Sequence, residues 1–349
     1  MSSLSNQIIS KTDTFNMLSL LRNYPEEIAT ARQIGESFKL DGMPEEINKI
    51  IVLGMGGSAI GGDFLRCYLK SSCTVPVIVN RSYTLPKWVD QKTLVFACSF
   101  SGNTEETLKS VNQLKQSGAC VICLTSGGKL AALARANHYS VISLSNSRPP
   151  RTAFCFLALP MIVTLERAGI INDQTLYFKE TIKIASDLIS ECEANDSIVK
   201  NLTYSLVGKL PVIYSSDVME AVGSRWRCQF NENSKILALS NIVPEMNHNE
   251  ITGWNPCTAI LEKTHVIMIR DENDLPRIQK RFEINKTIIQ KQNVTINEVF
   301  SKGESLLARM MSLIIIGDYT SFYLAILNQV NPTEIENINF LKQELDRFS

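Results

Sequence analysis

The segment from Trp226 to Trp254 carries two ionisable side chains that could transfer protons. Glu232 lies in the run NENSK, and His248, one of three histidines, lies in the run MNHNE. A carboxylate can move a proton at carbon and an imidazole can move one at oxygen, so the pair suits proton shuffling on a sugar without a metal ion. These clusters could instead be polar loops or helix ends, since Asn and Ser bind local backbone. Glu245 and Glu250 are competing carboxylates nearby.

Two upstream loops are equipped to hold an anion. The first, in the run IVLGMGGSAIGGDF, has Gly56 and Gly57 to let backbone N–H groups approach a ligand, and Ser58 to add a hydroxyl. Converging hydroxyls and N–H groups at a helix start can satisfy the oxygens of a phosphate monoester without any basic side chain. The second loop, in the run VFACSFSGNTEETL, places such polar side chains before a helix: Ser99, Ser101, Asn103 and Thr104.

Each loop also has an interpretation without a sugar phosphate. The first could be a tight turn and the second an N-cap. The run GMGGSA half-matches the fingerprint of dinucleotide-binding domains, but the acidic residue expected roughly 20 residues further on is missing, and Asn80 and Arg81 end that strand. Arg81 could accept a 2′-phosphate, so an NADP-linked enzyme is an alternative. The second serine-rich loop counts against it, because a dinucleotide domain has no need of a second phosphate cradle.

These side chains must be positioned by an alternation of strands and helices that begins near Lys49. Continuous apolar runs separated by helices indicate a parallel sheet covered on both faces. Ligands bind such sheets at the carboxyl ends of the strands, where both loops fall. The expected strands are 50–53, 75–79, 94–98, 120–124 and 140–144, and the expected helices lie near 60–71, 104–117 and 128–137.

The alternation resumes in the second half of the chain. An apolar helix at 153–168 and a helical stretch at 177–202 precede expected strands at 211–214, 259–261 with 266–269, and 295–299. Further helices are expected near 218–231, 275–291, 304–327 and 333–347. The fold expected is α/β, with a helical segment at 1–47 and two doubly wound parallel-sheet domains at 48–170 and 171–349, the second ending in helices.

Composition excludes several classes of protein. The 349 residues are 44% hydrophobic and 20% charged, as in a globular protein. Basic and acidic residues number 35 each, without long runs of either sign, so we expect no nucleic-acid partner and no membrane surface. Nine scattered cysteines, including the CxxC of Cys120 and Cys123, are interpreted as buried thiols. The first residues lack the pattern of a signal peptide, which predicts a cytoplasmic protein.

Five runs together resemble a known family. GMGGSAIGGD, SFSGNTEET, PPRTAF, RWRCQFNENSK and PEMNHNEI occur in this order and at separations similar to those of the bifunctional phosphoglucose/phosphomannose isomerases, members of the sugar isomerase (SIS) domain superfamily. The resemblance extends from about residue 45 to the end of the chain. It implies two SIS domains and a homodimer with an active site between domains, to which the partner subunit contributes.

The resemblance also implies roles for individual residues. Glu232 would carry the proton between C1 and C2, and His248 would reach in from the other subunit to assist ring opening. Arg151 would stabilise the enediolate, and Lys342 would be the ring-opening lysine near the C-terminus, although Asn331 replaces the family's aspartate. The positions that match the family's phosphate site are Gly56, Gly57, Ser58, Ser99, Ser101 and Thr104.

The expected activity is reversible aldose–ketose isomerisation of hexose 6-phosphates, without metal or cofactor. Glucose 6-phosphate and mannose 6-phosphate would both lead to fructose 6-phosphate. One alternative is a regulator that senses sugar phosphates through SIS domains, but such proteins generally carry a DNA-binding module, and the first 45 residues show no basic helix-turn-helix pattern. Another is an isomerase for a different sugar phosphate.

Overall fold

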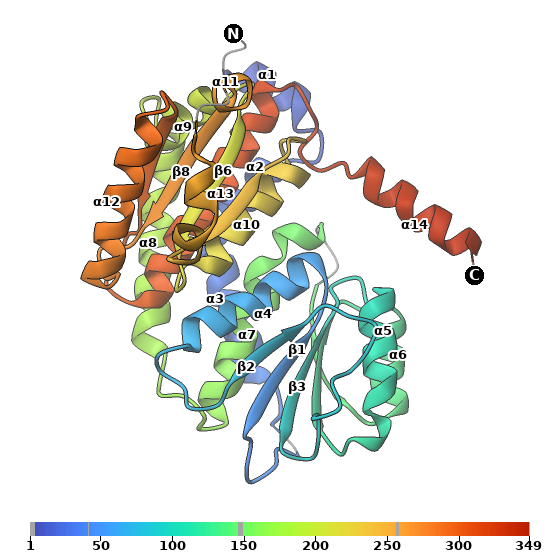
Figure 1. The fold of residues 1–349 in the computed structure, drawn as a ribbon. Helices are drawn as coiled ribbons and strands as arrows, with labels where there is room; N and C mark the ends of the chain where they lie inside the picture. Colours follow the sequence, from blue (N-terminus) through green and yellow to red (C-terminus); the bar gives the residue numbers. More distant parts are fainter. Residues whose placement is uncertain (1–3, 41, 146–148, 256–257, 349) are drawn as a thin grey trace.

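Two parallel β-sheets form the framework of the computed structural model, which describes residues 4–40, 42–145, 149–255 and 258–348 (Figure 1). The first sheet has the order β2-β1-β3-β4-β5 and the second has the order β7-β6-β8-β9. All neighbouring strands run parallel. The strands are β1 (Lys49–Leu53), β2 (Val77–Asn80), β3 (Thr93–Cys98), β4 (Cys120–Thr125), β5 (Ser140–Ser143), β6 (Leu210–Ser216), β7 (Leu239–Val243), β8 (Thr264–Arg270) and β9 (Thr295–Phe300).

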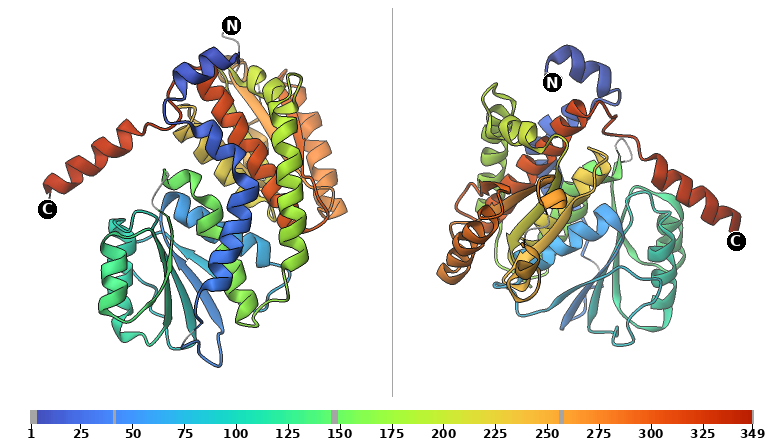
Figure 2. Two further views of the ribbon diagram at one scale, coloured as in Figure 1. Left: turned by 180° about the vertical axis from the view of Figure 1, so that it is seen from behind. Right: turned by 45° about the horizontal axis from the view of Figure 1, so that its top comes forward.

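Helices cover both sheets and join them (Figure 2). Three N-terminal helices, α1 (Asn6–Thr12), α2 (Met17–Arg22) and α3 (Tyr24–Ser37), precede β1. The first sheet carries α4 (Gly56–Leu69), α5 (Glu105–Asn112) with the 3₁₀ turn η1 (Gln113–Gln116), and α6 (Gly128–Ala136). The turn η2 (Pro150–Thr152) leads into α7 (Phe154–Arg167). The remaining helical elements are α8 (Thr175–Glu193), α9 (Ile198–Leu206), α10 (Glu220–Glu232), η3 (Glu245–His248), η4 (Glu250–Gly253), α11 (Thr258–Leu261), α12 (Pro276–Gln290), α13 (Leu306–Leu327) and α14 (Glu336–Phe348).

The structure confirms the predicted α/β class and corrects several elements. Residues 259–261, predicted as a strand, belong to the short helix α11, because a brief apolar run does not distinguish the two. Strand β7 was not predicted, since it lies at an edge of its sheet and is mostly half-exposed. Helix α4 begins at Gly56 rather than near 60. The helical stretch 177–202 is two helices, with Ser197 capping the second.

One hydrophobic core extends through both halves of the chain. It combines the fully buried residues of α7, such as Leu157 and Ile162, with those of α13, such as Leu313 and Phe322. Helix α13 is long and apolar enough to cross a membrane, but the most apolar 18-residue window is 100% buried inside the fold, which makes it a core helix. Helix α4 packs closely on α7, because a Cβ at Gly61 would lie 2.8 Å from the carbonyl oxygen of Leu157. The two sheets are therefore held together by helices that pack in one common core.

A buried ionic cluster connects three of these helices. Arg225 of α10 donates to both carboxylate oxygens of Asp318 in α13, at 3.0 and 2.6 Å, and Tyr24 of α3 donates to the same carboxylate. Arg225 and Asp318 are each 2% exposed. Arg225 also donates to the backbone oxygen of Arg151, 3.2 Å away. The cluster thus supports a residue predicted to be functional.

We expect Asp318→Asn to destabilise the fold strongly. The substitution leaves the Arg225 charge buried without its counter-ion, and breaking a buried pair costs about 3–5 kcal/mol. Urea unfolding followed by circular dichroism measures the change. Asp187→Asn is the control, because the Lys183–Asp187 pair is exposed and such pairs contribute about 0–1 kcal/mol. Equal losses in the two variants would contradict the prediction.

Candidate active site

The two predicted phosphate loops meet at the carboxyl edge of the first sheet. Strands β1 and β3 are neighbours. From β1 the chain continues to β2 on one side, and from β3 it continues to β4 on the other side, so the strand order reverses between β1 and β3. At such a switch point the loops leave the sheet in opposite directions and open a crevice between them. The loop after β1 begins at Gly54 and the loop after β3 begins at Ser99. The topology therefore places both loops side by side.

The first loop enters directly into helix α4. Gly56 has φ = +50°, a left-handed conformation that favours glycine, and a Cβ there would have no atom within 4 Å. Met55 at the N-cap makes no side-chain capping bond, and Ser58 lies in the first turn, 7% exposed. Gly57 lies beside Arg151, because a Cβ at Gly57 would be 3.7 Å from the Arg151 Cα. The helix start, its N–H groups and Arg151 thus occupy one neighbourhood.

The second loop is braced so that its hydroxyls are fixed. Ser99 Oγ and Thr104 Oγ1 are 2.9 Å apart, and Thr104 is the N-cap of α5 without using its own side chain as a cap. A hydroxyl has one donor and two acceptor sites, so this pair keeps one donor for a ligand. Ser101 is exposed. Gly102 cannot carry a side chain, since its Cβ would lie 1.9 Å from the carbonyl oxygen of Gly127.

Arg151 and Glu232 come together although they lie 81 positions apart in the sequence. Arg151 is 5% exposed, and its Nη1 lies 3.6 Å from Glu232 Oε2. Its Nε donates to Asn233 Oδ1 at 2.8 Å, and its Nη2 donates to the carbonyl oxygen of Pro332. Burial lowers the pKa of Arg151 from its usual 12.5, and the charge of Glu232 acts to raise it while that of Arg225 acts to lower it. A carboxylate and a guanidinium thus lie in contact beside the first loop.

Glu232 also lines a cavity of 570 Å³ on the side of the C-terminal segment. The cavity lies between the end of α10 and the start of α14. Lys235 lies in the same cavity, and burial, reinforced by Arg151, lowers its pKa to about 8, while Glu232, Glu334 and Glu336 act in the opposite direction. The lining residues are Asn231, Glu232, Lys235, Val330, Asn331 and 334–338.

His248 lies at the opposite edge of the second sheet from Glu232. Helix α10 follows β6 and runs back along the sheet, so its last residue, Glu232, is at the amino edge. His248 follows β7 and is therefore at the carboxyl edge, where it is exposed in η3. The five residues of β7 span about 17 Å. A single chain therefore does not bring His248 to Glu232.

Lys342 lies on α14, which projects from the body of the molecule (Figures 1 and 2). The structure describes no buried residue in this helix, and Lys342 is exposed. Only the beginning of α14 borders the cavity that contains Glu232. The single chain thus unites the phosphate loops, Arg151 and Glu232, but leaves His248 and Lys342 outside this group.

Comparisons with known proteins identify the family. The profile named SIS domain matches residues 45–166, and the profile named bacterial phospho-glucose isomerase C-terminal SIS domain matches residues 195–345. The bifunctional phosphoglucose/phosphomannose isomerase of Caldicellulosiruptor bescii is 40% identical over 334 residues, which cover 94% of this chain and 98% of that one. The chain belongs to the bifunctional phosphoglucose/phosphomannose isomerase family. The Thermoplasma acidophilum member is 32% identical, with coverage of 92% and 97%.

Solved structures agree with this family in fold. A hypothetical protein from Thermus thermophilus superposes with a TM-score of 0.74 at 16% identity, over 98% of this chain and 92% of that chain. At this identity the likeness concerns the fold alone. It agrees with the two parallel-sheet halves described above.

The carboxylates that compete with Glu232 have other contacts. Glu250 accepts hydrogen bonds from Tyr214 and from Asn241, the latter at 2.6 Å. Glu245 is exposed and accepts from Asn249 at 2.8 Å. Both follow β7 and so lie at the carboxyl edge of the second sheet, away from Arg151. Glu232, by contrast, lies 3.6 Å from Arg151.

The other two histidines, His265 and His138, lie outside the group formed by Arg151 and Glu232. His265 lies in β8 with no exposed surface, and its Nε2 is 2.7 Å from Asn297 Oδ1. Burial lowers its pKa, which favours the neutral imidazole. His138 follows α6 with φ = +55°. Among the described residues, no group of three or more His, Cys, Asp or Glu side chains could hold a metal ion.

Sequence reasoning gave no role to three contacts of the site. Asn233 and the backbone oxygen of Pro332 bind Arg151, and Lys235 lies beside Glu232. Asn233 and Lys235 belong to the ENSK run, so their proximity to Glu232 was visible. The contacts made by the carbonyl oxygens of Asn331 and Pro332 could not be predicted, because backbone contacts do not depend on residue type.

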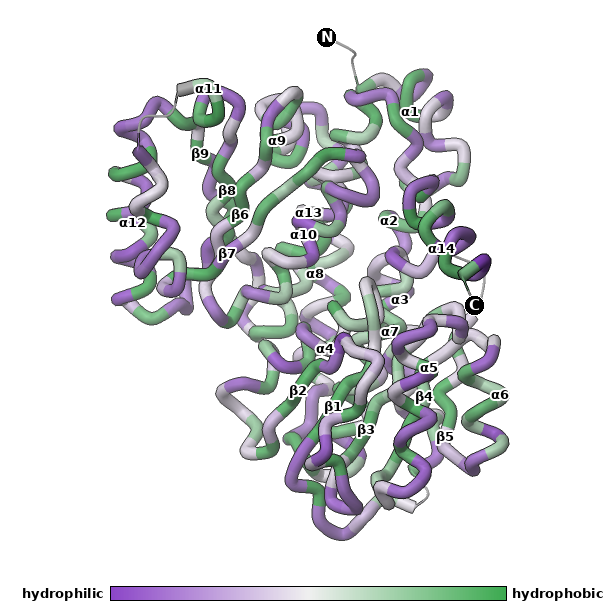
Figure 3. Tube along the Cα trace, turned by 45° about the vertical axis from the view of Figure 1, so that its right-hand side comes forward, coloured by the Kyte–Doolittle hydropathy of each residue, from purple (hydrophilic) through white to green (hydrophobic). Residues whose placement is uncertain are grey.

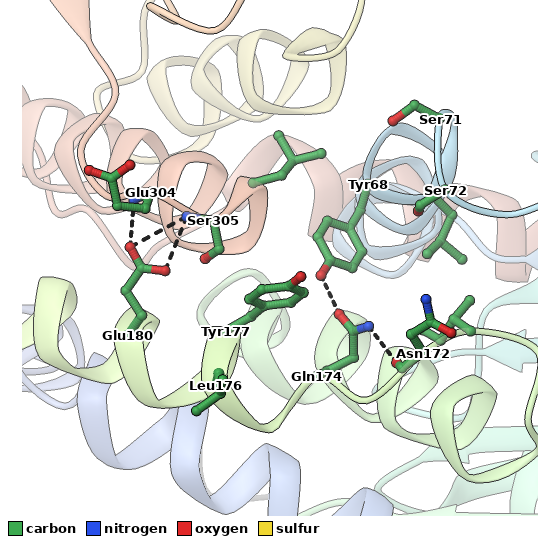
Figure 4. Close-up of a pocket in the computed structure, with 13 residues that line it drawn as sticks. Tyr68, Ser71, Ser72, Asn172, Gln174, Leu176, Tyr177, Glu180, Glu304 and Ser305 are labelled. Atoms are coloured by element: carbon green, nitrogen blue, oxygen red, sulfur yellow. Dashed lines mark hydrogen bonds between the residues drawn. The ribbon is translucent and has the colours of Figure 1, made fainter.

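A second cavity of 570 Å³ lies between α4, α8 and α13 (Figure 4). Tyr68 donates to Gln174 on one wall, and Glu180 accepts from the backbone N–H groups of Glu304 and Ser305 on another. Its lining includes no residue of the predicted site. The cavity that borders Glu232 is therefore the one of interest for the family's chemistry.

The phosphate loops give a prediction specific for binding. We expect Ser99→Ala to raise the KM for a hexose 6-phosphate about 10- to 100-fold, since a hydrogen bond to a charged group is worth about 1.5–3 kcal/mol. Steady-state kinetics of the isomerisation measures this effect. Ser37→Ala is the control, because the Ser37 hydroxyl donates to the Gln33 carbonyl oxygen within α3 at an exposed position. An unchanged KM in Ser99→Ala would remove Ser99 from the phosphate site.

Proposed function

We propose that this protein is a phosphoglucose/phosphomannose isomerase. It interconverts glucose 6-phosphate and fructose 6-phosphate, and mannose 6-phosphate and fructose 6-phosphate, through a shared enediolate. The observation that carries the proposal is the contact of Arg151 with Glu232 at 3.6 Å, beside the phosphate loop that contains Gly57. The membership of the family supports the choice of hexose 6-phosphates as substrates.

The phosphate of the substrate would bind where the two loops meet. Gly56, Gly57 and Ser58 offer a helix start, and Ser99, Ser101 and Thr104 offer hydroxyls, at the carboxyl ends of β1 and β3. Phosphates commonly bind at helix N-termini. The binding energy of this remote group would hold C1 and C2 against the reacting side chains.

The proton transfer would be performed by Glu232. Its carboxylate removes the proton from C2 of the aldose and returns it to C1, which gives the ketose. Arg151, fixed by Asn233 and Pro332, offsets the negative charge that develops on the enediolate. Protonation of C2 on the opposite face would account for mannose 6-phosphate. This scheme uses only side chains of the protein and no cofactor.

The ring-opening group would come from a second copy of the chain. Because His248 and Glu232 lie at opposite edges of the second sheet, we assign His248 to the site of the partner in a homodimer. Helix α14 supports association, since it has both hydrophobic and hydrophilic residues (Figure 3) and projects from the body of the molecule (Figure 1) with no buried residue described in it. Exposed apolar side chains on such a helix are typical of protein contacts: Ile338, Phe340, Leu341, Leu345 and Phe348. Lys342 would approach a site only in such an assembly.

A reducing compartment fits the cysteines, and we place the enzyme in the cytoplasm. Cys120 and Cys123 of the CxxC lie in β4 as free thiols. Burial raises the pKa of the Cys123 thiol to about 12, which makes it unreactive. The proposed partners are hexose 6-phosphates and a second copy, without nucleic acid or membrane.

A coupled assay on the purified protein tests the proposal. Fructose 6-phosphate is supplied with EDTA, and glucose 6-phosphate is detected through an added dehydrogenase. The assay is then repeated from mannose 6-phosphate, with a purified phosphoglucose isomerase added as coupling enzyme. Turnover of both substrates is expected. Turnover of fructose 6-phosphate alone would limit the enzyme to phosphoglucose isomerisation, and binding without turnover of either would favour the sensor.

A further inference from the structure

Lys235 has a combination of features that the proposed reaction does not explain. It lies three residues after Glu232, and its side chain enters the cavity that Glu232 lines. Its Nζ donates to the backbone oxygens of Glu232, of Asn233 at 3.4 Å, and of Asn331 at 2.9 Å. An ammonium group has three donors, so these carbonyls occupy all of them. Lys235 therefore has no donor left for a substrate.

The backbone of Lys235 is in a conformation that lysine rarely adopts. Its φ is +57°, in the left-handed region. The N–H of Ile236 bonds back to the carbonyl oxygen of Phe230 at 3.4 Å, which closes the end of α10 across Lys235. Glycine is the usual residue at this position of a helix end, because it has no Cβ to strain the backbone. A lysine here costs free energy, and such strain is characteristic of functional positions.

The contacts of Lys235 join two segments that both touch Arg151. One is the end of α10, with Glu232 and Asn233. The other is the segment 331–332, where Lys235 binds Asn331 and Arg151 binds Pro332. The two cations thus fasten the end of α10 to the C-terminal segment from adjacent points. Arg151 contacts the carboxylate of Glu232, and Lys235 holds the backbone oxygen of the same residue.

We propose that Lys235 is a positioning residue that fixes the backbone around Glu232 so that its carboxylate meets Arg151 and the substrate. This inference rests on the proposed isomerase function. Lys235 acts through the carbonyl oxygens that it holds and does not exchange protons with the sugar. Loss of its charge weakens the attachment of the end of α10 to the segment 331–332 and lets Glu232 move.

Titration of Lys235 links this role to pH. The charged groups that face it are Arg151 from η2, Glu232 from α10, and Glu334 and Glu336 from the C-terminal segment. Because its pKa is about 8, the side chain loses its proton as the pH rises through this value, and kcat should fall there. Stability should change in the opposite direction. Between about 8 and the ordinary value of 10.5, the unfolded chain binds more protons at this group, so linkage raises the free energy of unfolding with pH.

Steady-state kinetics of four variants from pH 6.5 to 10 tests the inference. We expect Lys235→Met to lower kcat about 10²-fold with little change in KM, since a displacement of about 1 Å in the site has that effect. Lys235→Gly should also lower kcat. Glycine suits the left-handed backbone at this position, so this variant should fold well, and its loss of kcat would then report the lost positioning contacts. Lys235→Arg should recover part of kcat and keep it to higher pH than the wild type, because arginine stays charged. Lys183→Met is the control, since Lys183 pairs with Asp187 at an exposed position and should behave as wild type.

The outcomes separate this inference from the proposed function. If the wild type is active and the kcat of Lys235→Met and Lys235→Gly is unchanged, the positioning role is overturned, but the proposed isomerase function stands. If kcat of Lys235→Arg falls at the same alkaline pH as kcat of the wild type, the positioning role is also overturned. A wild type without turnover would overturn the proposed isomerase function and the inference that rests on it. Loss of kcat in the glycine variant, with its melting temperature kept, supports the role.

Discussion

Glu232→Gln is expected to lower the turnover of both hexose 6-phosphates about 10²- to 10⁴-fold, the range that a positioned acid or base contributes. Glutamine preserves the shape of the side chain but cannot accept the proton from C2. The predicted phosphate loops follow β1 and β3 of the first sheet, and Glu232 belongs to neither loop. Binding of the substrate should therefore remain. Kinetics in both directions measures the loss, and isothermal titration with fructose 6-phosphate measures the binding.

Glu245→Gln is the matched control for this experiment. Glu245 is a carboxylate of the same segment, but it is exposed after β7 and contacts Asn249. We expect its kinetics to remain near those of the wild type. A Glu232→Gln variant with near-normal turnover, or an equal loss in Glu245→Gln, would remove Glu232 from the role of base.

Mixing two inactive variants is expected to restore activity. In the proposed homodimer, Glu232→Gln would lack the base and His248→Ala would lack the ring-opening imidazole, so each variant alone would have two defective sites. In a mixed dimer, the intact Glu232 of one chain meets the intact His248 of the other, which reconstitutes one site of two. Random exchange makes about half of the dimers mixed, so about a quarter of the wild-type activity should return. Turnover after refolding the two chains together measures the recovery.

The control for mixing is a chain with both substitutions. Paired with Glu232→Gln, it can supply no intact base, and no activity should return. If verified mixed dimers of Glu232→Gln and His248→Ala remain inactive, His248 does not act across the interface. A monomeric and fully active wild type would contradict the homodimer in the same way. Sedimentation measures the assembly in parallel.

The sequence determined the local structure that supports the site. Continuous apolar runs such as 50–53 and 94–98 are buried on both faces, which only a covered parallel sheet allows, so these strands were predictable. The glycines and hydroxyl residues after these strands marked the loops before any contact was known, and at Gly102 a positive φ of +70° favours glycine. The edge strand β7 was not predicted, because its mostly half-exposed residues show little periodic hydrophobic pattern.

The tertiary structure decided which of these residues meet. Nothing in the residue types brings Arg151 to Glu232, or Lys235 to the carbonyl oxygen of Asn331, since these contacts depend on how α7 and α13 pack the two sheets together. The separation of Glu232 from His248 likewise follows from the direction of α10 along its sheet. Hydrophobic patterning specifies elements because it acts over a few residues. The relative placement of distant elements is set by the packing of a shared core, which no short segment encodes alone.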